Sequence, residues 1–315
     1  MGVSENTEPD GAAPVVPVTD RIEAVRRALA TALRERIVGD DAEAKHHEIV
    51  LAEGPRWFAP DSAVVRVHTD ASMFIGGMRA LLLQSLHPLA MAGVARHSDY
   101  RNDPWGRLQR TADFLARTTF GTAETAERAV AGVRAVHARV HGIAADGRPY
   151  SASDPHLLRW VHVAEVDSFL EAHRAYGRHR LDDAGCDEYV AQMAVVARKL
   201  GVTAPPESVR GLRDQLRSFR HELHGTAESR DAARYLLLQP PLPMAARVPY
   251  SLIVAAAIAT LPAWARRDLR LPWLPLTERF VMRPIGHGIA GAFRWAMSSD
   301  ESFSAADGFS SPAAH

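Results

Sequence analysis

The chain has 315 residues and 47% hydrophobic content, which is enough to bury one large core. Lysine plus arginine equals aspartate plus glutamate at 37 each, and this balance of charge argues against a nucleic-acid partner. The single cysteine, Cys186, excludes an internal disulfide or an all-cysteine metal site and favours a reducing, cytoplasmic compartment.

Both ends of the chain are expected to lie outside the folded domain. Residues 1–18 lack the basic start and long apolar run of a secretory signal and are expected to form a disordered tail. Residues 19–298 are expected to form one helical domain, and residues 299–315 a second disordered tail.

Helical periodicity begins at residues 19–39, where Asp20 is a candidate cap and apolar residues recur every three or four positions. Residues 56–70 are interpreted as a linking segment. A helical run at residues 73–95 follows. Pro88 is expected to bend or break this run, because proline removes a backbone donor.

Capping signals bound the next helices. Pro104 suits a first helical turn, and the helix that it opens is expected to stop at Gly121. Thr122 is expected to cap a helix that runs to Gly142.

A further helix is predicted at residues 152–177, with Ser153 or Asp154 as its cap and Pro155 in its first turn. Residues on one face at helical spacing are Leu158, His162, Glu165 and Phe169. Later helices are predicted at residues 186–200, 205–223 and 229–239.

The uncharged run at residues 248–265 contains Pro249 and Pro262, and the twelve residues between them are too few to span a bilayer. We interpret it as a buried core helix without a transmembrane segment, and peripheral contact with a membrane is the second interpretation. No segment alternates between polar and apolar residues over more than a few positions. The expected fold is therefore all-α, a single helical domain with a cofactor pocket between core helices.

The pocket is suggested by residues 76–111, which begin apolar and end on two arginines and a threonine. At helical spacing one face carries Arg107, Arg110, Thr111 and Phe114. Two cations and a hydroxyl beside an aromatic ring are unusual in a core stripe, and the segment also contains His87 and His97. Periodicity alone allows a pocket or a pair of surface arginines.

Six short motifs occur in order along the chain. They are LLLQSLHP ending at Pro88, AGVARHS ending at Ser98, RLQRT at residues 107–111, VHARVHG at residues 136–142, Ser-Asp-Pro at residues 153–155 and Trp-Val-His at residues 160–162. With these motifs the chain resembles the MpaB and latex-clearing-protein oxygenase family over about residues 50–285. The ordered set carries the resemblance, because each motif alone is weak.

The resemblance implies a helical domain that holds haem b with its iron and uses dioxygen to cleave carbon–carbon double bonds of isoprenoid chains. It also implies a histidine as proximal iron ligand and an R-x-x-K-T motif that lines the haem pocket. The matching motif here makes Arg107, Arg110 and Thr111 the candidate catalytic residues.

Arg110 stands where the family motif has lysine. A guanidinium stays protonated and has no lone pair for iron, so Arg110 is expected to pair with a haem propionate or to polarise bound oxygen. The latex-clearing branch also has an upstream carboxylate as a base, and only His97 and Asp99 lie near that place in this chain.

By the same resemblance His137 is the expected iron ligand, and His141, one helical turn later, is the second choice. The residues alone would also allow one member of this pair to join a polar network and the other to face solvent.

Three further histidines are candidates for cofactor binding. His162 is interpreted as a ligand, a group that supports a ligand, or a hydrogen-bonded core residue. His87 is expected to bond carbonyls freed by the proline bend. His97, with Ser98, is expected to cap a helix or to meet a propionate.

Two other metal patterns carry less weight. The run at residues 221–224, His-Glu-Leu-His, resembles but does not match the H-E-x-x-H zinc helix and is interpreted as a solvated helix end. The pair His162 and Glu165 has the reverse of the Glu-x-x-His order found in di-iron bundles.

Three functions follow from these patterns. The first is a haem-dependent oxygenase that uses dioxygen on an apolar, isoprenoid-like small molecule. The second is a haem-binding carrier or sensor without turnover, and the third is a helical interaction protein that has lost its cofactor. The oligomeric state is left open.

Overall fold

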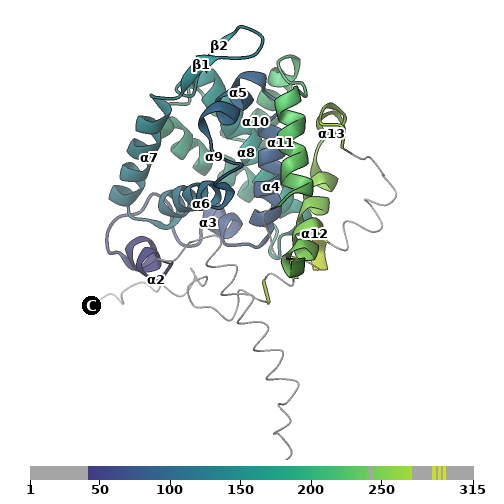
Figure 1. Ribbon diagram of the computed structural model, residues 1–315. Coiled ribbons are helices and arrows are strands. Elements are labelled where there is room, and N and C mark those ends of the chain that lie inside the picture. The colour runs from purple at the N-terminus through teal and green to yellow at the C-terminus, as the bar shows by residue number, and fades with distance from the viewer. Residues whose placement is uncertain (1–41, 241–243, 272–285, 289, 292–293, 296–315) are drawn as a thin grey trace, which may run out of the picture.

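The computed structural model describes residues 42–240, 244–271, 286–288, 290–291 and 294–295 (Figure 1). The helix predicted at residues 19–39 and both expected tails lie outside these residues. Within them the chain is mostly helical, as predicted, with one small two-stranded hairpin.

The elements follow one another along a single helical domain (Figure 1). The first helices are α2 (Ala42–His46), the π-helix η1 (His47–Leu51), α3 (Ala63–His68), α4 (Ser72–Gln84), α5 (Pro88–His97), α6 (Pro104–Phe120) and α7 (Ala123–His137). The hairpin consists of β1 (His141–Ile143) and β2 (Pro149–Ser151). After it come α8 (Pro155–Tyr176), α9 (Asp183–Leu200), α10 (Val209–Ser218), the 3-10 helix η2 (Phe219–His221), α11 (Ala227–Leu238), α12 (Met244–Thr260) and α13 (Ala263–Asp268).

Among the described residues the predicted caps Thr122 and Asp154 are confirmed, and Pro104 opens α6 after Asp103, a cap that the sequence analysis did not predict. The side chain of Asp103 accepts a backbone N–H in the first turn of α6, Thr122 does so for α7, and Asp154 does so for α8. Gly121 ends α6, and Pro88 separates α4 from α5. These boundaries depend on neighbouring residues alone, which is why the sequence predicts them.

The linker predicted at residues 56–70 is wrong, because the segment contains α3. This helix has six residues, and Val64, Val65 and Val67 are buried within it. A run this short shows no repeat of the three-or-four spacing that identifies longer helices.

The end predicted for the helix after Thr122 is also wrong. The helix stops at His137 instead of Gly142, and an antiparallel hairpin follows in which Gly142 pairs with Tyr150. The hairpin turns at Gly147, whose φ of +83° is a conformation that favours glycine. The Asp-Gly pair at residues 146–147 is a hairpin signal that the helical interpretation overlooked.

The C-terminal helices overlap the predicted segments, but the single helix expected at residues 248–265 is divided, because α12 ends at Thr260 and α13 begins at Ala263 after Pro262. Helix α12 buries Ala256 and Ala257 against α4 and α8, which confirms a core helix. Among the described residues no helix is both long enough and apolar enough to cross a bilayer.

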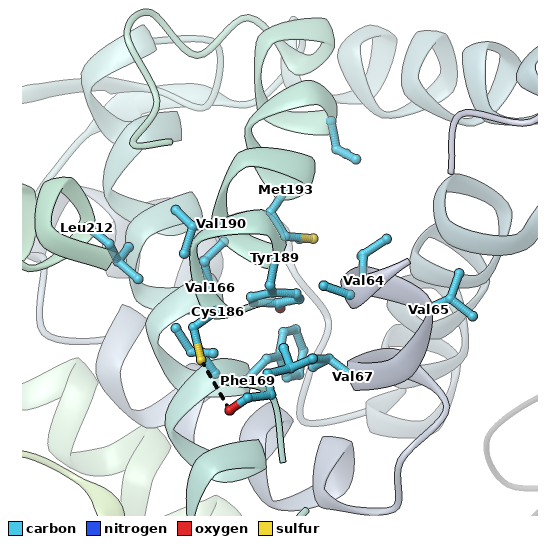
Figure 2. Close-up of a cluster of buried hydrophobic side chains, with 14 of the residues drawn as sticks. Val64, Val65, Val67, Val166, Phe169, Cys186, Tyr189, Val190, Met193 and Leu212 are labelled. Carbon is cyan, nitrogen blue, oxygen red and sulfur yellow. Dashed lines mark hydrogen bonds between the residues drawn. The ribbon is translucent and has the colours of Figure 1, made fainter. Parts of the chain in front are cut away.

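The main apolar core lies between α3, α8 and α9 (Figure 2). Valines of α3 meet Phe169 of α8 and Tyr189 of α9, and the Cys186 thiol lies 3.9 Å from the Leu181 carbonyl oxygen. Phe114 of α6 packs against this cluster from the side. The core therefore fixes which face of α8 turns towards α3, α6 and α9.

Helices α4 and α8 run in close contact through the middle of the domain. A Cβ atom on Gly76 of α4 would lie 2.6 Å from Phe169 Cδ1 and 3.0 Å from the Phe169 Cα atom. Backbone atoms cannot give way as side-chain ends can, so Gly76 is required for this approach. Its neighbour Gly77 leaves 3.9 Å to the same ring, which is ordinary contact.

Gly76→Ala is expected to destabilise the protein by about 1–3 kcal/mol, because the methyl group overpacks the contact between α4 and α8. Gly77→Ala on the same helix is the matched control. It is expected to be neutral or to stabilise by about 0.5–1 kcal/mol through its helix propensity. Denaturant unfolding measures both variants, and equal effects would contradict the assignment of a close contact to Gly76.

Candidate functional site

A histidine of α3 joins three of the core helices. His68 Nδ1 lies 2.8 Å from Thr119 Oγ1 of α6, and His68 Nε2 lies 3.3 Å from the Tyr189 hydroxyl of α9. Burial lowers the pKa of His68 to about 3, so the imidazole is neutral near pH 7. Sequence analysis missed His68, because its segment was interpreted as a linker.

Helix α8 adds His162 and Glu165, one turn apart. His162 is 7% exposed, its Nε2 has no hydrogen-bond partner among the described residues, and burial lowers its pKa to about 4. Glu165 is partly exposed, yet burial raises its pKa to about 7, and its charge helps to raise the pKa of Tyr189.

Glu165→Gln is expected to stabilise the protein at pH 8 and far less at pH 5. The carboxyl ionises near 4.5 in the unfolded chain and near 7 in the folded protein. The stability that a protonated Glu165 provides is therefore fully present below pH 4.5 and is lost as the pH rises through about 7. At about 1.4 kcal/mol per pKa unit, a shift from 4.5 to about 7 gives the variant a gain of roughly 3–3.5 kcal/mol at pH 8.

Denaturant unfolding at the two pH values measures this gain. Glu171→Gln on the same helix is the control, since Glu171 forms a surface ion pair with Arg174 at 3.1 Å. A gain that does not change between pH 5 and pH 8 would contradict a raised pKa for Glu165.

The two histidines expected to stand one helical turn apart do not form a helical pair. His137 is the last residue of α7, and His141 lies on β1, because the chain leaves the helix between them. His137 is partly buried, burial lowers its pKa, and its Nδ1 has no hydrogen-bond partner among the described residues. His141 is exposed.

The RLQRT motif lies on α6, and its residues differ in burial. Arg107 is partly buried and donates from Nη1 to Ser98 Oγ, while burial lowers its pKa. Arg110 is exposed and lies 3.2 Å from an Asp103 carboxylate oxygen. The Thr111 hydroxyl is also exposed and donates to the Arg107 carbonyl oxygen at 3.0 Å. Of the expected stripe, only Arg107 and Phe114 turn inwards.

His97 and Ser98 lie at the end of α5. Ser98 is the C-cap residue, as expected. His97 is exposed, and its Nε2 lies 3.1 Å from the Tyr150 hydroxyl of the hairpin.

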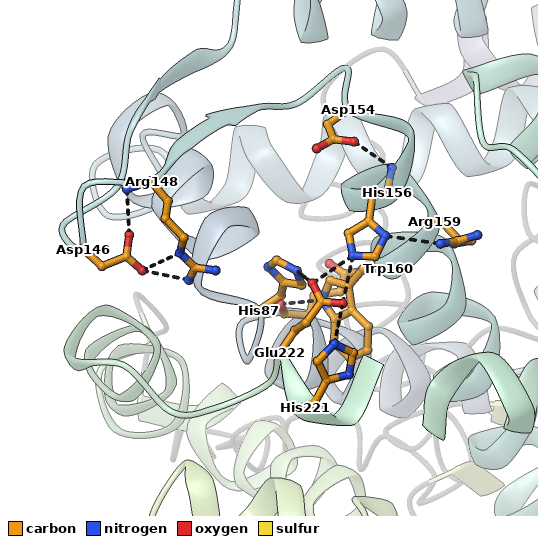
Figure 3. A network of polar contacts seen from close by, with 10 residues as sticks. His87, Asp146, Arg148, Asp154, His156, Arg159, Trp160, His221 and Glu222 are labelled. Atoms are coloured by element: carbon orange, nitrogen blue, oxygen red, sulfur yellow. Dashed lines mark hydrogen bonds and ion pairs between the residues drawn. The ribbon is translucent and has the colours of Figure 1, made fainter. Parts of the chain in front are cut away.

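The prediction that His87 bonds carbonyls freed by the proline is wrong. Its Nε2 lies 3.3 Å from a Glu222 carboxylate oxygen, and Glu222 also bonds His156 Nε2 at 2.8 Å (Figure 3). The interpretation of the His-Glu-Leu-His run as a solvated helix end is therefore wrong for Glu222. Residues 87, 156 and 222 are too far apart in sequence for any spacing rule to connect them.

The structure thus places the predicted residues in separate environments. No hydrogen bond or ion pair within the described part of the chain connects His137 or His162 with the three predicted catalytic residues of α6. His137 and His162 share one property, a partly or fully buried neutral imidazole with an unpartnered nitrogen. Such an imidazole can ligate a metal, and the Glu165 carboxyl can hold or release a proton near neutral pH.

Comparisons with known proteins give one match. The sequence model of a family described as "ER-bound oxygenase mpaB/B'/Rubber oxygenase, catalytic domain" matches residues 65–295. Searches of curated proteins and of solved structures found no match. The matched range contains all five histidines predicted to bind a cofactor, together with His68 and Glu165.

Proposed function

The chain belongs to the family of ER-bound oxygenase MpaB and rubber oxygenase catalytic domains, and we propose that it is a haem b-dependent oxygenase acting with dioxygen on an apolar small molecule. The observation that carries this proposal is the family match over residues 65–295, which names an oxygenase catalytic domain. An isoprenoid chain is the substrate class that we favour.

The buried histidines fit a haem group. An axial ligand must be a neutral imidazole whose nitrogen is not already hydrogen-bonded within the protein. His137 Nδ1 and His162 Nε2 meet this condition. His87 Nδ1 also lacks a partner, but Glu222 holds that ring through Nε2, and His97 Nε2 faces the Tyr150 hydroxyl. We propose His137 as the iron ligand, since it carries the family-like histidine motif, and keep His162 as the alternative.

Haem, when bound, would supply iron that activates dioxygen. Glu165 would hold or release a proton at its carboxyl near neutral pH, whereas only His97 and Asp99 lie near the place of the upstream carboxylate of the latex-clearing branch. His68 would orient the Tyr189 hydroxyl beside it. The apolar side chains of Phe114 and Leu115 pack against the same cluster and would exclude water, which supports an apolar substrate.

The RLQRT residues suit the polar edge of the cofactor. Arg107 is already desolvated, so its guanidinium would bind a propionate more strongly than an exposed cation would. Arg110 would have to exchange Asp103 for the second propionate, and Thr111 would hold the helix backbone at Arg107.

Absorption spectroscopy of protein purified from haem-supplemented cells tests the proposal. We expect a Soret band, haem at one equivalent by pyridine haemochrome assay, and oxygen uptake with isoprenoid substrates. Haem without oxygen uptake would favour a carrier or sensor. The absence of both haem and a Soret band would contradict the first two functions and leave the interaction protein.

The proposal also includes the compartment of the cell in which the protein acts. The reducing environment favoured by the single cysteine fits the cytoplasm. If the substrate is apolar, contact between the protein and a membrane surface would be useful. Cell fractionation tests both.

A further inference from the structure

His87, His156 and Glu222 come from three distant parts of the chain and converge on one point (Figure 3). His87 precedes α5, His156 lies in the first turn of α8, and Glu222 follows η2. We propose that these three side chains bind a divalent transition metal, with Zn²⁺ as the reference ion. The proposal is separate from the haem site, because none of the three residues is offered there as an iron ligand.

The distances suit such an ion. Nitrogen and oxygen ligands lie about 2.0–2.2 Å from Zn²⁺, so two ligands of one ion are about 3.0–3.5 Å apart. Glu222 Oε2 lies 2.8 Å from His156 Nε2 and 3.3 Å from His87 Nε2, and one ligand atom from each residue falls within 4.8 Å of the others. Only a small closure would bring the three donors around an ion.

The donor set selects the class of metal. Two imidazole nitrogens and one carboxylate suit zinc, iron and other transition metals, whereas calcium and magnesium prefer oxygen ligands. Three protein ligands would leave a further position for water.

The surroundings hold one ligand firmly and leave the others accessible. The His87 side chain is 1% exposed, and its ring packs beside the adjacent rings of Trp160 and Phe219 at centroid distances of 6.2 and 6.5 Å. The side chains of His156 and Glu222 are 42% and 23% exposed. An ion can therefore enter from the solvent side and meet a fixed imidazole on the inner side.

Arg159 opposes metal binding and supplies a sharp test. Its Nη2 lies 3.2 Å from His156 Nδ1. A guanidinium only donates, so His156 Nδ1 accepts and the proton of the neutral ring stays on Nε2. A metal at Nε2 would require Arg159 to turn away, and its positive charge also repels the ion.

Titration of the full-length protein without a histidine tag, after chelator treatment, tests the proposal with Zn²⁺ and with Co²⁺, whose visible spectrum reports its ligands. Wild type is expected to bind one equivalent at this site. His156→Ala and Glu222→Gln are expected to lose that equivalent. Both side chains are partly exposed, and glutamine retains a hydrogen-bond acceptor, so these variants should fold.

Two further variants distinguish a metal site from a group of side chains that are joined only by hydrogen bonds. His221→Ala is the matched control, since His221 is 79% exposed and lies 3.7 Å from Glu222, and it should bind like wild type. Arg159→Gln should bind about tenfold more tightly, the effect of removing one positive charge at roughly 6 Å from a divalent ion at the dielectric constant of water. Absence of binding in wild type, or equal binding by Glu222→Gln, would overturn the proposal.

Discussion

His137→Ala is expected to abolish the Soret band of the haem-loaded protein or to shift it strongly. In histidine-ligated haem proteins an axial imidazole holds the haem iron through its nitrogen, and an alanine side chain has no lone pair with which to bind iron. His137 ends α7 and is only partly buried, so the substitution leaves no large cavity in the core. The expected loss is therefore a loss of ligation rather than of folding.

Three measurements separate ligation from other effects. Circular dichroism should show the same helix content in the variant and in wild type. Added imidazole should restore a haem spectrum to His137→Ala, because it replaces the missing ring. His141→Ala is the matched control, four residues later and exposed on β1, and should keep the wild-type spectrum.

His162→Ala decides between the two candidate ligands. If it removes the Soret band while His137→Ala retains it, the ligand is His162, whose buried Nε2 lacks a partner. If neither variant changes the spectrum, neither histidine is the ligand and the proposed site is wrong.

The sequence predicts the boundaries of the helices better than the site. Caps such as Thr122 and Asp154 act on the next turn of their own helix, so neighbouring residues contain the necessary information. The fold class follows from the same local periodicity. Two of the errors, α3 and the hairpin at Gly147, occur where an element is too short for the helical period to show.

The site depends on contacts between residues that are distant in sequence. Glu222 meets His87 across 135 positions and His156 across 66, and no periodic pattern extends so far. His68 meets Tyr189 across 121 positions for the same reason. The family motifs select the candidate histidines, but the environment of each depends on how the helices pack.

Asp167→Ala is expected to destabilise the protein by about 3–5 kcal/mol, the loss usually found when one partner of a buried ion pair is removed. Asp167 on α8 lies 2.8 Å from Arg79 of α4, and their side chains are 10% and 2% exposed. Asp167 Oδ2 lies at this distance from Arg79 Nη2 but accepts no hydrogen bond, because the N–H group is not aligned with it. The attraction between the two side chains is therefore mainly coulombic. The lower part of the range is therefore expected.

The loss arises because Arg79 cannot reach solvent. Its guanidinium donates to Ser168 Oγ at 2.7 Å and to the Thr260 carbonyl oxygen at 3.1 Å, so one side chain joins α4, α8 and α12. Both acceptors are neutral, and neither balances a buried positive charge. Without Asp167 the charge stays desolvated and unpaired in the middle of the domain.

Glu124→Ala provides the control, because it removes an ion pair with Arg128 whose side chains are 79% and 63% exposed. Such pairs contribute about 0–1 kcal/mol. The double variant Arg79→Met with Asp167→Leu removes both charges and should recover most of the stability lost by Asp167→Ala. Denaturant unfolding measures all three variants. Equal small losses for Asp167→Ala and Glu124→Ala would show that the Arg79 guanidinium reaches water in solution, and the close contact between α4 and α8 would then be looser than the structure shows.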